Sequence, residues 1–146
     1  MFPQTNINDI THVIQLAIAP VFLLTAVGAI IGVLVNRLAR IVDRIRVLED
    51  LLRHATPEEY KKEQDELTLL DRRLKLIYLA VTCAVFCALF VGLLIVVAFI
   101  DALLEINLAK VVGVLFVFAM LSFIASLIVF LREIFLAVSA TGRTIK

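Results

Sequence analysis

Residues 13–46 read VIQLAIAPVFLLTAVGAIIGVLVNRLARIVDRIR, an apolar run that passes directly into a run rich in arginine. The apolar part, Val13–Val35, contains no charged side chain, and a helix needs ~20 such residues to cross the hydrocarbon core of a bilayer. Two more uncharged runs, Leu76–Ile100 and Val111–Leu131, are also long enough. The sequence therefore predicts an all-α integral membrane protein with three transmembrane helices.

The composition supports this class. The chain is 62% hydrophobic with a mean hydropathy of +1.06, which lies outside the range of soluble domains. Its formal net charge of +1 gives no indication about nucleic acid, and we predict no nucleic-acid partner. Both cysteines, Cys83 and Cys87, lie inside the second apolar run, which excludes a disulfide framework.

The basic residues are distributed unevenly. Thirteen of the fourteen Lys and Arg residues lie between the first two runs or after the third, and only Lys110 lies elsewhere. Basic residues near membrane spans stay cytoplasmic, so we expect the N-terminus outside and the C-terminus inside. The predicted segments are an external N-terminus (1–12), helix 1 (13–35), a cytoplasmic hairpin (36–75), helix 2 (76–100), an external turn (101–110), helix 3 (111–131) and a cytoplasmic tail (132–146).

The segment between the first two runs has the pattern of an antiparallel helical hairpin. A heptad-like series of apolar residues leaves the first run, and a second series leads into the second run. The return begins at Thr56-Pro57-Glu58-Glu59, in which Thr56 and Glu59 are spaced as a capping box. We therefore predict a coiled-coil hairpin formed by extensions of the first two spans. Its seam is Leu34, Leu38, Ile41, Ile45, Leu48 and Leu52 on one arm, and Leu67, Leu70, Leu74, Ile77 and Val81 on the other.

A second face of the first helix is small and polar. At 100° per residue this stripe lies opposite the apolar seam. Ordinary helix packing, within the subunit or between copies, would account for it, and so would an aqueous path through an oligomer. Gln15, in the outer half of the span, is a candidate for an outer vestibule. The candidate pore or oligomer stripe is Gln15, Thr25, Ala29, Gly32, Asn36, Arg40 and Asp43.

Small residues at four-residue spacing predict close helix packing in all three spans. They are Gly28 and Gly32 in the first, Ala84, Ala88 and Gly92 in the second, and Ser122 and Ser126 in the third.

Basic residues crowd the inner boundary, where they set topology and meet anionic head groups or, in a channel, form an anion funnel. Asp43 and Asp71 could pair with some of these arginines. The acidic hairpin tip, 58–66, is a solvated end or a docking surface for a cytoplasmic protein. The candidate anion contacts are Arg37, Arg44, Arg46, Arg72, Arg73 and Lys75.

No catalytic constellation is present in the sequence: it contains no nucleophile–base pair, metal-ligand cluster or glycine-rich phosphate loop. Cys83 and Cys87 share a helix face that could hold Cu(I), but small apolar packing is the simpler interpretation. We predict no enzyme activity, cofactor or metal.

The stretches AIAPVFLLT (17–25) and NRLARIVDRIR (36–46) resemble a family of small bacterial three-span membrane proteins grouped only as a domain of unknown function. The resemblance covers most of the chain. It implies a bacterial cytoplasmic membrane and supplies no activity.

Two hypotheses of function follow. The first is a homo-oligomeric ion or small-solute channel built around the first span, since three spans are too few for one chain to hold the two halves of a transporter. The second is a non-transporting scaffold whose hairpin recruits partners or assembles copies.

Overall fold

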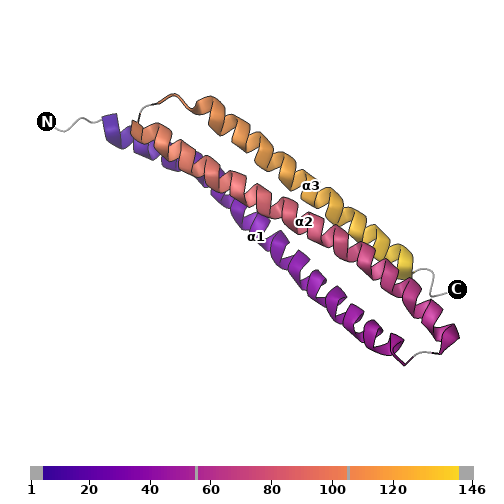
Figure 1. The fold of residues 1–146 in the computed structure, drawn as a ribbon. Coiled ribbons are helices and arrows are strands. Elements are labelled where there is room, and N and C mark those ends of the chain that lie inside the picture. Colours follow the sequence, from indigo (N-terminus) through magenta and orange to yellow (C-terminus); the bar gives the residue numbers. More distant parts are fainter. Residues whose placement is uncertain (1–4, 55, 105, 142–146) are drawn as a thin grey trace. The chain divides into compact units, whose positions relative to one another are not determined.

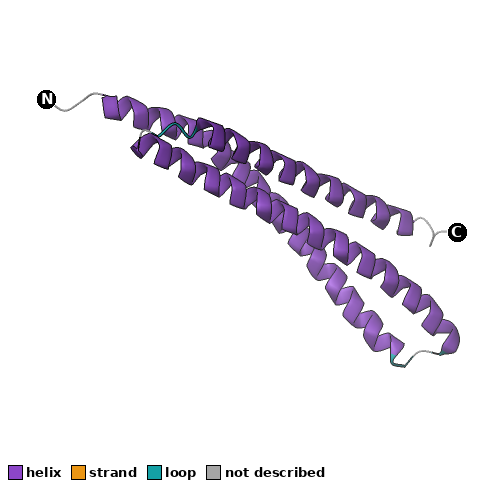
Figure 2. Cartoon of the chain, turned by 45° about the horizontal axis from the view of Figure 1, so that its top comes forward, coloured by secondary structure: helices purple, strands orange, loops and turns teal. Residues whose placement is uncertain are grey.

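The computed structural model describes residues 5–54, 56–104 and 106–141. They form three α-helices, α1 (Thr5–Leu52), α2 (Pro57–Leu104) and α3 (Ala109–Thr141), joined by short loops (Figures 1 and 2). Each helix is long and apolar enough to span a membrane. The predictions of an all-α chain with three candidate spans and of a multi-pass membrane protein are therefore confirmed.

The helices form two units, each built from a part of all three. The first unit is Met1–Ile30 with Cys83–Ile124, and the second is Ile31–Thr82 with Ala125–Lys146. α1 and α2 each continue as helix well beyond their apolar runs, as expected for a first span that extends without a break.

Buried positions recur every seven residues along each helix. The period is visible in α3 as Ala119, Ser126 and Glu133, all fully buried. Because seven residues make nearly two helical turns, these side chains return to the same face, where they meet the neighbouring helices. The other positions with this period are Val27, Leu34, Ile41 and Leu48 in α1, and Leu70, Ile77, Ala84 and Val91 in α2, with Ala80, Cys87 and Leu94 beside them.

In the first unit, an aromatic contact joins α2 and α3. The Phe90 ring centroid lies 5.8 Å from that of Phe118 on α3, and 6.4 Å from that of Phe86 on its own helix. The turn between these helices is shorter than the predicted ten-residue link, because Asp101–Leu104 still belongs to α2. The Asp101 carboxylate accepts a hydrogen bond from the Leu108 N–H at 2.9 Å, which fixes the chain just before α3 begins.

In the second unit, α1 and α2 are joined by a capped turn. The Thr56 N–H donates to the Glu59 carboxylate at 3.1 Å, and the Thr56 hydroxyl donates to the same oxygen at 2.7 Å. These bonds lower the pKa of Glu59, the hydroxyl bond contributing most. This is the carboxylate half of a capping box; the Thr56 hydroxyl acts as a donor to the side chain instead of capping the backbone.

Ion pairing and buried leucines hold these two arms together. Arg44 donates through Nε and Nη2 to Glu66 at 2.9 and 2.8 Å, and Leu48 and Leu70 are buried. Every residue of the predicted seam is buried or half-buried. The arms therefore pack along the predicted face.

Candidate functional site

The third helix carries one carboxylate into the buried face of the second unit. Glu133 lies two residues beyond the apolar run 111–131 and its side chain is fully buried. It takes the position that Ser126 occupies one heptad earlier, where the Ser126 hydroxyl donates to the Ala80 carbonyl at 2.8 Å. A buried carboxylate costs several kcal/mol of desolvation, so it needs partners of opposite charge.

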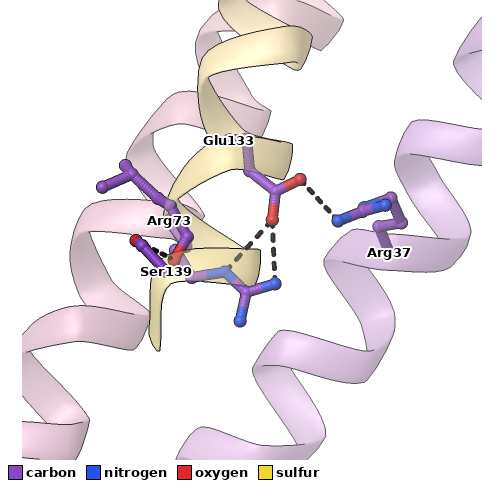
Figure 3. Close-up of polar contacts among 5 residues, drawn as sticks. Arg37, Arg73, Glu133 and Ser139 are labelled. Carbon is purple, nitrogen blue, oxygen red and sulfur yellow. Dashed lines mark hydrogen bonds and ion pairs between the residues drawn. The ribbon is translucent and has the colours of Figure 1, made fainter. Parts of the chain in front are cut away.

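Two arginines from the other helices supply that charge (Figure 3). Arg73 on α2 donates through Nε at 3.1 Å and Nη2 at 2.9 Å, both to the same Glu133 oxygen, Oε1. Arg37 on α1 places Nη2 at 2.7 Å from the other oxygen, Oε2. The carboxylate therefore joins all three helices, and we call these three residues the charged junction.

The two arginines are held differently. Arg73 makes aligned hydrogen bonds, whereas Oε2 of Glu133 accepts no aligned N–H despite its short distance to Arg37. The Arg37 contact is thus an ion pair by distance. Its guanidinium also lies over the Phe130 ring, with 5.5 Å between Cζ and the ring centroid, a favourable cation–π distance.

The charged junction carries two cations and one anion. The Arg37 and Arg73 side chains are 28% and 22% exposed, while Glu133 is not exposed at all. The guanidinium groups therefore connect a buried carboxylate to the surface, and their remaining N–H groups make no other hydrogen bond within the described residues.

The predicted stripe on α1 contributes no residue to this junction. All seven of its members are exposed, and the Thr25 hydroxyl donates to the Val21 carbonyl of its own helix at 3.3 Å. A Cβ added at Gly28 or Gly32 would meet no atom within 4 Å. Neither glycine is therefore required for a close approach between helices of the described chain.

The other predicted packing residues lie at various depths. Ala84 and Ser126 are buried, whereas Ala88, Gly92 and Ser122 are half-buried. A Cβ at Gly92 would also meet open space. Only Ser126 among them has a hydrogen bond that joins two helices.

The predicted anion contacts fall into two groups. Arg37 and Arg73 are the half-buried members of the charged junction, and the exposed ones are Arg44, Arg46, Arg72 and Lys75. Asp71 pairs with a lysine of this cluster and not with an arginine: its carboxylate lies 3.0 Å from Lys75, one turn along α2. Asp43 has no ion pair among the described residues.

No acidic or thiol-rich metal centre is present in the described part of the chain, where no three His, Cys, Asp or Glu residues lie together in a suitable way. Cys87 is buried and Cys83 is half-buried. The hairpin tip, 58–66, is exposed except at Glu63 and Glu66, which are partly covered.

Glu133 is the residue that sequence reasoning missed. The signal was its spacing, seven residues after Ser126, which had already been assigned to a packing face. A carboxylate in register with buried small residues, close to several arginines at the same membrane boundary, predicts a buried ion pair.

Comparison with known proteins gives one match. No curated protein and no solved structure matches the chain. Residues 17–143 match a family described as "Protein of unknown function (DUF2721)", and this range includes both stretches that carry the resemblance noted above and all three residues of the charged junction. The match covers most of the chain, and the protein therefore belongs to this family of uncharacterised proteins.

Proposed function

We propose that this protein assembles with copies of itself in a bacterial cytoplasmic membrane and forms an ion or small-solute channel around α1. One observation carries the proposal: the small and polar stripe of α1 is exposed along its whole length, opposite the face that the chain buries. Lipid gives no reason for small residues on an exposed helix face, whereas close approach of a second helix does.

The orientation follows from charge. Thirteen of the fourteen Lys and Arg residues lie on one side of the spans, so the arms of the second unit lie in the cytoplasm and the α2–α3 turn lies outside. In this orientation Asn36 lies at the cytoplasmic end of the first span and Gln15 lies near its outer end.

In a symmetric ring of copies, each polar side chain of the stripe would form a ring around a central path for ions or small solutes. Gln15, Thr25 and Asn36 lie along one exposed side of α1, and symmetry would repeat each of them around the axis. Arg40 and Asp43 continue this side into the cytoplasm, where they would line the inner mouth.

The test has two stages, assembly and flux. Particle mass is measured in lipid nanodiscs, and ion flux is then measured in liposomes. Gly32→Leu should disrupt assembly or block flux, because its side chain would fill the contact between copies. Val33→Leu is the matched control, since Val33 is exposed but lies 100° around the helix. Asn36→Leu should reduce flux and leave particle mass unchanged.

A monomer in nanodiscs would refute both the assembly and the channel. An oligomer that conducts nothing would refute the channel alone and favour the second candidate, a non-transporting scaffold. The observation behind that candidate is the packed pair of arms, which buries Leu48 and Leu70 and ends in an exposed acidic tip. Such a surface suits a basic cytoplasmic partner.

A further inference from the structure

The charged junction has an excess of positive charge. Glu133 can balance one guanidinium, yet Arg37 and Arg73 both lie within 3 Å of its oxygens. The cluster therefore keeps a net charge of one cation. This positive charge is fixed in place, because the buried carboxylate holds both arginines near each other from different helices.

The junction also lies at a defined depth. Arg37 follows the end of the first apolar run by two residues, Arg73 precedes the second run by three, and Glu133 follows the third by two. At 1.5 Å per residue these positions are ~3–5 Å beyond the hydrocarbon core. The polar head groups of a bilayer occupy this layer.

The donors that remain suit an oxyanion. Arg73 uses Nε and Nη2 for Glu133, and Arg37 offers Glu133 no aligned N–H. Both side chains are partly exposed, and their other N–H groups make no hydrogen bond within the described residues. A guanidinium presents a planar fork that matches phosphate oxygens.

We infer that Arg37 and Arg73 form a binding site for the phosphate of an anionic phospholipid head group. Glu133 is a positioning residue, because it is fully buried and cannot reach the lipid. Basic pockets between transmembrane helices on the cytoplasmic side bind anionic head groups by the same physics. Arg37 differs from its stripe neighbours Asn36 and Arg40 in that its side chain is half-buried against Glu133, whereas theirs are exposed.

The test compares lipids and variants by native mass spectrometry and by titration of purified protein in detergent. Phosphatidylglycerol should bind and stabilise the protein, whereas phosphatidylcholine should do neither at equal concentration. Inorganic phosphate is the third arm. If it binds as tightly as phosphatidylglycerol, the site takes a soluble anion and the lipid assignment is wrong.

Two double variants distinguish specific binding at Arg37 and Arg73 from general attraction of the lipid to all basic residues at the membrane boundary. R37Q/R73Q should weaken phosphatidylglycerol binding roughly 25-fold, about fivefold for each arginine. The matched control R72Q/R132Q removes the same charge from two exposed arginines that also lie within four residues of an apolar run, and it should retain most of the binding. Equal losses in the two double variants would overturn the site.

A second pair of substitutions covers the case in which R37Q/R73Q fails to fold. R37K/R73K keeps both charges and both ion pairs to Glu133 but removes the guanidinium forks. We expect a folded protein that binds phosphatidylglycerol roughly fivefold more weakly. Unchanged affinity would mean that charge alone attracts the lipid, and the proposed geometry would be refuted.

Discussion

Removing the carboxylate of Glu133 should destabilise the protein more than any other single loss of charge. In Glu133→Leu, Arg37 and Arg73 lose the anion that they share, while the volume of the side chain at position 133 stays roughly the same. The nitrogen–oxygen distances of 2.7 and 2.9 Å place the charge centres ~4 Å apart, where each pair is worth about 4 kcal/mol at an effective dielectric of 20.

Opposing terms reduce this gross attraction. Desolvation of the buried carboxylate costs several kcal/mol, and the two arginines repel each other. Arg37 and Arg73 are partly exposed, so water would hydrate them once Glu133 is gone. We therefore expect a loss of about 2–4 kcal/mol in the free energy of unfolding, which corresponds to a fall of roughly 5–10 °C in Tm.

The chain offers its own reporter. Cys87 is fully buried, and in a Cys83→Ser background it is the only thiol. A thiol-reactive fluorescent dye then follows unfolding with temperature in detergent. Glu66→Leu is the matched control: it removes the same kind of Arg–Glu pair from an exposed position, where such pairs are worth under about 1 kcal/mol.

A compensating variant tests the cause. Arg37→Met and Arg73→Met added to Glu133→Leu should recover most of the lost stability, because no uncompensated charge remains. If Glu133→Leu alone is as stable as the parent, the junction contributes no net stability. If the triple variant is worse than the single one, uncompensated charge is not the reason for the loss.

Three further predictions follow from the topology, the seam and the cap. A reporter at the C-terminus and one near Thr56 should read cytoplasmic and one at Ile106 external; an external signal near Thr56 would overturn the orientation. Leu48→Asp should cost about 3 kcal/mol and increase proteolysis of residues 36–75, because Leu48 is buried, whereas Val47→Asp, at a half-exposed position, should have little effect. Because the pKa of Glu59 is lowered in the folded chain, the stability from its cap is present above the ordinary glutamate pKa and is lost as the pH falls through the lowered value. Hydrogen-exchange protection of the first turn of α2 should fall with it, and the Glu59→Gln variant should lack that pH dependence.

Long-range patterns made most of the fold predictable. The uncharged runs required three spans, and apolar residues at heptad spacing identified the faces that α1 and α2 bury. The α2–α3 turn was predicted too long, because Asp101 is a charged residue at the end of an apolar run. The sequence gives no sign that its carboxylate holds the backbone of Leu108.

The charged junction was harder to predict for a different reason. Periodicity identifies the buried face of each helix, but it does not say which charges from separate helices meet. Asp43 and Asp71 are close to the arginines along the chain, yet both are exposed. Glu133 is 60 residues from Arg73 and becomes its partner only because α3 packs beside α2.

The charged junction also makes the packing of the helices depend on the order in which they are synthesised. Arg37 and Arg73 are both made before Glu133, so α1 and α2 enter the membrane with two like charges at neighbouring ends and no anion between them. Repulsion between the two guanidiniums opposes close packing at these ends until α3 arrives. The third helix therefore supplies the counter-charge for this part of the packing between the first two.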